Sequence, residues 1–420
     1  MRTVLGAAAL AACLHFPVAR AATSNDRARQ ALSLDEAMAR AAQRSPLVRL
    51  AQKERDVVRS LRVGAGVLLP ANPIVTFSAG GRRDRSASVP PANGFEWLAR
   101  AEQMVEIGGQ RGTRLKEAAR ALDVASARLE LAEIETRARV RAAYVGMQLA
   151  EAQARAAGER EALGARVLES ARARVKAGAA SDVELHLAEI EAARFTHERL
   201  GAELAVDEAA DAVRALVGVP ARTTLELTTP LSPPAAPARD LDAAIAEAQA
   251  RRVELALLDA ERAEIDASIV RLRRERVPSP SLFVEVAGQQ PGQLYAGGGL
   301  SVALPVARRN QGELARARAE RDRLGEERDV TARAVELEVA HLYRAVAAHR
   351  LQSTLWSSQI VPAATATVEL VRQGWTAGKF DIFRVVQVTR EAEEAKKREL
   401  ETLGALWDAT IALDRATGAR

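Results

Sequence analysis

The longest uninterrupted helical segment sets the strictest limit on what this chain can fold into. Residues 109–176 contain no proline and carry apolar residues at helical spacing. At 1.5 Å per residue, a helix of this length extends roughly 100 Å. A compact domain of ordinary size cannot enclose such a helix. We therefore expect an elongated molecule rather than one globular core.

The apolar residues of this segment form two stripes. One stripe includes Leu115, Leu122 and Leu129, and the other includes Val124 and Leu131. Both have an average spacing near the 3.5 residues of a left-handed supercoil. They are offset by ~200° around the helix. Because a two-stranded coiled coil needs only one seam, the pattern predicts a helix with a neighbour on each side, as in a wall or ring of helices.

The order of helix breakers and turns occurs twice along the chain, which predicts an internal twofold repeat. We place the two repeats at residues 22–219 and 241–420, each containing a helix, two strands, a very long helix and a final helix. The segment 220–240 between them contains five prolines and a short predicted strand at 224–228. In the second repeat, Pro362 interrupts the long helix and predicts a kink or a loosened turn.

Four segments read as strands, namely 73–81, 95–107, 281–289 and 295–306. Their lengths match those of tilted strands that cross a membrane. Four strands cannot close a barrel, and an open sheet edge is too costly in lipid. Several chains must therefore share one barrel if these strands meet a membrane. The strand pattern alone is equally compatible with two soluble hairpins that cap the helices.

The N-terminus has the features of a targeting segment. Residues 1–21 combine a positive start, an apolar stretch and the small-residue site Ala19-Arg20-Ala21, which predicts a signal peptide cleaved after Ala21. The preceding Leu10-Ala11-Ala12-Cys13 also resembles a lipobox, in which Cys13 would be the lipid anchor. We favour cleavage. No later run of apolar residues is long enough to predict a transmembrane helix.

Composition and residue spacing exclude several classes of function. A single Cys excludes a disulfide framework and a Cys-based zinc site. Basic residues are not clustered with aromatics, which argues against nucleic-acid binding. The five histidines lack chelating spacing, and no nucleophile motif or carboxylate pair stands out. We therefore expect no catalytic, metal or cofactor-binding residues, and a protein that is not an enzyme.

The ordered set of short motifs resembles the TolC-like outer-membrane efflux proteins. The resemblance spans residues 33–418, and the run from Gln103 to Arg111 is similar to the CzcC-type heavy-metal branch. The motifs that carry it are Leu34-Asp35-Glu36-Ala37, Glu106-Ile107-Gly108-Gly109-Gln110-Arg111, Leu216-Val217-Gly218-Val219-Pro220, Leu304-Pro305-Val306 and Gly374-Trp375-Thr376-Ala377-Gly378-Lys379-Phe380-Asp381.

The resemblance implies a mainly α fold with a small β part. In a homotrimer, four strands per chain would form one 12-stranded transmembrane β-barrel in the outer membrane. The long helices would form a periplasmic α-barrel, and shorter helices at 34–67 and 182–216 would stack beside them. The linker 220–240 would belong to an equatorial region.

The implied function is that of a passive exit duct, the outer-membrane channel of a tripartite efflux system. Its partners would be a periplasmic adaptor, an inner-membrane transporter and outer-membrane lipid. In the heavy-metal branch the cargo would be metal cations. The alternative is a periplasmic coiled-coil adaptor or scaffold protein, which would have one helical hairpin and no duplicated strand pairs.

By the same resemblance, two helix turns lie at the periplasmic tip, where the channel narrows and the adaptor docks. The candidate residues there are Gly178 and Asp182 in the first turn, and Gly378 and Asp381 in the second. We expect Asp182 to be the N-cap of the returning helix. Asp381 is either the corresponding N-cap or a carboxylate that lines the gate.

Overall fold

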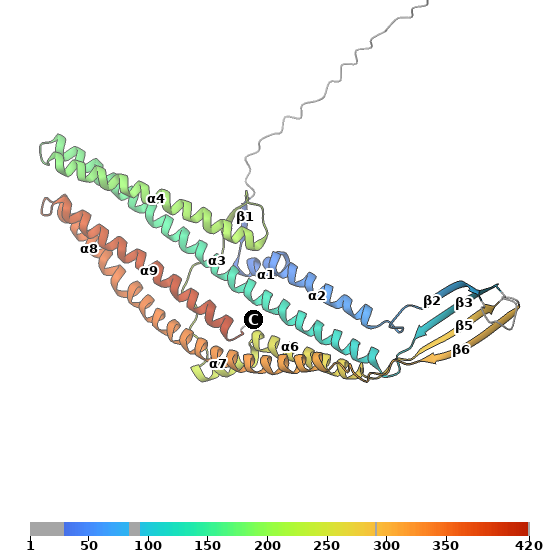
Figure 1. The fold of residues 1–420 in the computed structure, drawn as a ribbon. Helices are drawn as coiled ribbons and strands as arrows, with labels where there is room; N and C mark the ends of the chain where they lie inside the picture. Colours follow the sequence, from blue (N-terminus) through green and yellow to red (C-terminus); the bar gives the residue numbers. More distant parts are fainter. Residues whose placement is uncertain (1–28, 84–92, 290–291, 419–420) are drawn as a thin grey trace, which may run out of the picture.

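The computed structural model describes residues 29–83, 93–289 and 292–418. The molecule is long, with its helices side by side, a four-stranded sheet at one end and two helix turns at the other (Figure 1). This confirms the expected mainly α fold with a small β part. The signal peptide at 1–21 and Cys13 lie outside the described residues. Among the helices that are described, none combines the length and apolarity needed to cross a membrane.

The first half of the chain contains two strands that lead into one very long helix. Its elements are β1 (Arg29–Leu32), α1 (Leu34–Arg44), α2 (Pro46–Ala65), β2 (Ile74–Arg83), β3 (Asn93–Met104), α3 (Gln110–Lys176) and α4 (Asp182–Val217). The single helix expected at 34–67 is wrong, because the chain breaks at Ser45, whose ψ is 129°. Pro46 disfavours helical geometry at the residue before it and itself starts α2.

The second half follows a similar order. Its elements are β4 (Thr224–Leu227), α5 (Leu241–Arg251), α6 (Val253–Arg274), β5 (Ser281–Gln289), β6 (Gln293–Ser301), α7 (Gln311–Leu355), the π-helical η1 (Trp356–Ile360), α8 (Val361–Thr376) and α9 (Ile382–Ala416). The loosened turn predicted at Pro362 is confirmed by η1, which ends two residues before this proline. A widened π turn accommodates a proline that lacks an N–H and crowds the preceding turn.

Helix α3 has neighbours on both sides, as its two apolar stripes predict. Helices α2 and α4 follow one another along one side, and α6 and α9 lie along the other (Figure 1). The side chains of Leu129, Val140 and Met147, which belong to the first stripe, are buried. The long helix therefore joins the two halves of the chain along nearly its whole length.

A buried tyrosine organises the middle of the molecule. Tyr144 of α3 is fully buried beside Leu32, Val213 and Val217. Its hydroxyl donates to the Leu32 carbonyl at 2.9 Å and accepts from the Thr229 backbone N–H at 3.2 Å. These bonds hold the two-stranded parallel sheet of β1 and β4 against α3. Strand β4 was predicted, whereas β1 depends on a partner far away in the sequence.

The later part of the linker, residues 232–239, lies against the second half of the chain. Arg350 of α7 donates to the Pro234 carbonyl at 2.8 Å, and the Tyr343 hydroxyl donates to the Arg239 carbonyl at 3.1 Å. Trp407 of α9 donates its indole N–H to the Ser232 carbonyl at 3.0 Å. These contacts satisfy carbonyl groups of a segment whose prolines prevent regular structure.

Candidate functional site

Both turns at the tip use the same backbone motif to end a long helix. Gly178 and Gly378 have φ of 70° and 72°. The N–H of Ala179 bonds the Arg174 carbonyl at 2.8 Å, and that of Lys379 bonds the Gly374 carbonyl at 2.8 Å. This is the Schellman arrangement, whose left-handed position favours glycine. The two candidate glycines therefore have a structural role in turning the chain.

The two candidate aspartates occupy different positions. Asp381 is the N-cap of α9, and its Oδ1 accepts from the Arg384 N–H at 2.9 Å. The N-cap expected at Asp182 is wrong, because Ser181 caps α4 and accepts from the Glu184 N–H at 3.3 Å. Ser181 and Asp381 each lie three residues after the glycine of their turn, so they occupy equivalent positions. Asp182 is the first residue of α4. At this position its negative charge is stabilised by the positive N-terminal end of the dipole of α4.

A small apolar cluster lies next to the two turns. It joins the hairpin of α3 and α4 to the hairpin of α8 and α9. Trp375 of α8 packs with Val371, Val385, Ala171 and Ala188. Outside this cluster, Val183, Phe380 and Phe383 are 65 %, 44 % and 53 % exposed. The tip therefore combines a fixed base with exposed apolar side chains, which suits a protein–protein contact.

The sheet has one apolar and one polar face. Its order is β2-β3-β5-β6, with every neighbouring pair antiparallel. Direct partners point to the same face, so the register assigns each side chain to a face. Val75, Phe77 and Val284 belong to one face and are 75 %, 68 % and 65 % exposed. Other members of that face are Phe95, Leu282, Val286, Leu294 and Leu300.

The opposite face carries the charges. Arg100 is the direct partner of Glu285, and Glu102 lies two residues further along β3. The Arg100 guanidinium is 3.1 Å from Glu102 and 3.8 Å from Glu285, and lies 3.7 Å from the centroid of the Phe283 ring. The sheet therefore presents an apolar face on one side and a charged face on the other.

The predicted ends of two strands need correction. Strand β5 has the expected bounds, but β3 ends at Met104 rather than at residue 107, and β6 ends at Ser301 rather than at residue 306. Pro305 follows β6 and cannot donate a ladder hydrogen bond. After β3, the turn at Gly108 is held by Gln110, whose Oε1 accepts from the Gly108 N–H at 2.8 Å.

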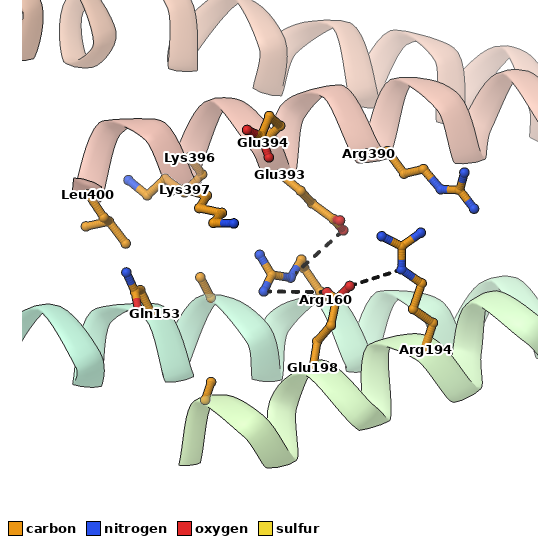
Figure 2. A pocket seen from close by; sticks show the side chains of 12 residues that line it. Gln153, Arg160, Arg194, Glu198, Arg390, Glu393, Glu394, Lys396, Lys397 and Leu400 are labelled. Atoms are coloured by element: carbon orange, nitrogen blue, oxygen red, sulfur yellow. Dashed lines mark hydrogen bonds and ion pairs between the residues drawn. The ribbon is translucent and has the colours of Figure 1, made fainter. Parts of the chain in front are cut away.

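A polar cavity of about 560 Å³ lies where α9 meets α3 and α4 (Figure 2). In Figure 2, Glu393 of α9 points across the cavity toward Arg160 of α3, and Glu198 and Arg194 extend from α4. The distances are 4.0 Å from Arg160 to Glu393, 3.9 Å from Arg160 to Glu198 and 3.1 Å from Arg194 to Glu198. Beside the cavity, Arg390 is paired with Glu191.

Burial raises the pKa of Glu393 from 4.5 to about 7. Its side chain is 17 % exposed, and Oε1 has no hydrogen-bond partner. Arg160 opposes the rise in pKa, whereas Glu198 adds to it. The carboxyl therefore changes charge near neutral pH within the contact between the two helical hairpins.

The predicted sites did not include Arg100, Glu285 or Glu393. Residue alternation along the predicted strands assigns Arg100 and Glu102 to one face, but only the register adds Glu285. Glu393 has no signal in the sequence, because its environment depends on the contact of α9 with α3. Across residues 29–83, 93–289 and 292–418, no group of three His, Cys, Asp or Glu side chains is arranged to hold a metal ion.

Comparison with known proteins agrees with this fold. Residues 37–219 match the family model for outer membrane efflux proteins. The chain is 26% identical over 320 residues to the cobalt-zinc-cadmium resistance protein CzcC of Cupriavidus metallidurans, covering 75% of each chain.

Two solved structures have the same fold. The outer membrane protein VceC of Vibrio cholerae has a TM-score of 0.70 at 15% identity, with 92% of this chain and 96% of that chain covered. The MtrE outer membrane channel of Neisseria gonorrhoeae has a TM-score of 0.68 at 18% identity, with 92% and 88% covered.

Residues 37–219 thus resemble the outer membrane efflux proteins, and the chain as a whole has the fold of solved outer membrane channels. Proteins of this family are efflux channels rather than enzymes. The alternative of a periplasmic coiled-coil adaptor is therefore rejected. Such a protein would also lack the two strand hairpins that form the sheet.

Proposed function

We propose that three copies of the chain form a closed passive duct, with one 12-stranded β-barrel in the outer membrane and an α-barrel in the periplasm. The observation that carries this proposal is the open sheet, which has one apolar face and two edge strands. Within the described residues, β2 and β6 each have a neighbour on one side only. Unpaired strand edges are not tolerated in lipid. Pairing β2 of one copy with β6 of the next removes both edges.

The helices support the same ring. Exposed apolar residues lie on α2, at Leu50 and Val57, and at heptad spacing on α7, at Val330, Leu337 and Leu351. These two surfaces belong to different halves of the chain. A contact between two different surfaces of identical subunits closes into a ring when its rotation allows. The arrangement thus favours a homotrimer over an isolated chain.

The tip is the proposed contact for a periplasmic adaptor, which would connect the duct to an inner-membrane transporter. The exposed Val183, Phe380 and Phe383 supply an apolar surface on the proposed periplasmic end. Asp381 is proposed to line the opening as well as to cap α9, so that three copies place a ring of carboxylates at the entrance.

For the cargo we propose metal cations. The support is the similarity to CzcC, whose name refers to resistance to cobalt, zinc and cadmium. A passive duct needs no tight binding site for what it carries, since tight binding would slow exit.

The proposal is tested by isolating the protein from outer membranes in mild detergent and measuring its mass by native mass spectrometry. We expect three chains per particle and ion-conducting channels after insertion into planar bilayers. Leu337→Glu places a charge on the proposed α7 contact and should reduce the trimer fraction. Glu336→Gln, on the same helix turn, serves as the control. A monomer that does not conduct would reject the duct.

A further inference from the structure

Arg100 has a distinctive position on the polar face of the sheet. It belongs to a row of direct cross-strand partners formed by Thr76, Arg100, Glu285 and Gly297. Arg100 is the cation that lies beside the carboxylates Glu102 and Glu285 on this face. Of the two outer members of its row, Thr76 is small, and the side chain of Tyr295 lies over Gly297.

The guanidinium of Arg100 is held from three directions. One terminal nitrogen lies 3.1 Å from a Glu102 oxygen, and the other lies 3.8 Å from a Glu285 oxygen. The guanidinium carbon lies 3.7 Å from the Phe283 ring centroid. Planar stacking and a forked set of donors fix an arginine more firmly than a flexible lysine. A single cation therefore serves two carboxylates at a defined place.

The two carboxylates have the chemistry of a divalent-cation site. Carboxylate oxygens are ligands for hard divalent ions and also bind zinc. Two of them within reach of one guanidinium would retain such an ion if the guanidinium were absent. A duct, however, conducts only if the ions that it carries bind weakly enough to leave.

We propose that Arg100 is a tethered counter-cation that keeps Glu102 and Glu285 from retaining divalent metal cations passing through the duct. This inference rests on the proposed function, because it requires the polar face to line the pore. A tethered cation competes at a high effective concentration. A passing ion must displace it before it can bind both carboxylates.

The exposure of the three side chains distinguishes this role from that of a buried structural ion pair. Arg100, Glu102 and Glu285 are 29 %, 27 % and 22 % exposed, so that water and ions reach them. Exposed ion pairs contribute little to stability. A purely structural role predicts no change in the response to metal ions when Arg100 is replaced.

The experiment measures potassium current through single channels in planar bilayers while Zn²⁺ is added. We compare the wild type with Arg100→Gln, Arg100→Lys and the double variant Arg100→Gln/Glu285→Gln. Removing a charge about 4 Å from the carboxylates should lower the half-blocking Zn²⁺ concentration about tenfold in Arg100→Gln. Arg100→Lys should resemble the wild type, and the double variant should lose most of the added block.

The outcomes separate the two proposals. Absence of conducting trimers in every protein, wild type included, rejects the duct itself. Channels of Arg100→Gln with an unchanged half-blocking concentration overturn the role of Arg100 and leave the duct intact. If Arg100→Gln does not assemble, Glu102→Gln/Glu285→Gln replaces it and leaves Arg100 unopposed. Its reversal potential should shift toward anion permeation, and an unshifted value overturns the inference.

Discussion

Glu393→Gln should stabilise the protein at alkaline pH and have little effect under acidic conditions. The pKa of this carboxyl is raised from 4.5 to about 7. A raised pKa means that the folded protein binds the proton more tightly than the unfolded chain does. The group's contribution to stability is therefore fully present below pH 4.5 and is lost as the pH rises through about 7. Gln resembles the protonated carboxyl at every pH.

The magnitude follows from the size of the pKa shift. At about 1.36 kcal/mol per pKa unit, the shift corresponds to at most ~3.4 kcal/mol. The side chain is 17 % exposed and lies beside a polar cavity, so screening by solvent reduces this figure to about 1.5–2 kcal/mol. Arg160 keeps a carboxylate partner in the variant, since Glu198 remains 3.9 Å away.

Thermal unfolding followed by far-ultraviolet circular dichroism in detergent measures the effect. With an unfolding entropy of about 2.1 cal/mol/K per residue, we expect the Tm of the variant to exceed that of the wild type by about 2 °C above pH 8. Below about pH 5 the two should nearly coincide. Glu394→Gln removes a charge from a side chain that is 55 % exposed on the same helix, and should change stability by less than about 0.5 kcal/mol. A Tm difference between Glu393→Gln and wild type that is equal at both pH values would refute the reasoning.

Three further substitutions test the tip and the middle of the molecule. Asp381→Asn keeps the N-cap of α9 and removes the charge, so it should preserve stability while lowering cation selectivity in bilayers. Asp381→Ala should lower the selectivity and also reduce the free energy of unfolding by about 1 kcal/mol. An unchanged selectivity in both variants would show that Asp381 is only a cap. Ser181→Ala should lose about 0.5–2 kcal/mol by denaturant unfolding, more than Asp182→Ala, because Ser181 accepts the capping bond; the reverse order would contradict the assignment. Tyr144→Phe leaves the Thr229 N–H without its partner and removes one of the two donors to the Leu32 carbonyl, which still accepts from the Thr228 N–H, and should cost about 1–3 kcal/mol; stability equal to that of the wild type would contradict the role of this hydroxyl.

Regular periodicity made much of the fold predictable. Helix α3 begins within one residue of its predicted start, and β5 has the predicted bounds. Both segments follow one repeating pattern that their neighbours do not override. The break at Arg252 between α5 and α6 has no proline to announce it. That arginine is 6 % exposed and donates to the Ala416 carbonyl at 3.0 Å, a contact that only the folded chain creates.

The candidate sites were predicted less completely, because several of them depend on contacts that only the folded chain creates. Gly178 and Gly378 were predictable because a left-handed turn favours one residue type. Asp182 was misassigned because Ser181 and Asp182 are both good caps, and the position of the turn decides between them. Arg100 and Glu393 depend on the register between strands and the contact between hairpins, respectively. Neither relation is encoded in local sequence spacing.

Because α3 is one continuous helix, its length sets the spacing between the packed regions of the molecule. This one helix contributes Gln110 at the sheet end, Tyr144 in the middle and Ala171 near the tip to separate packed regions. The distance between those regions is therefore fixed by the number of α3 residues that separate them. Adding seven residues to α3 would lengthen it by about 10 Å and keep its stripes nearly in phase. The change would fit only if α7 or α8 and the shorter helices beside them grew equally. A designer who wanted to match a deeper or shallower periplasm could therefore change the length only in such steps, made in both halves at once.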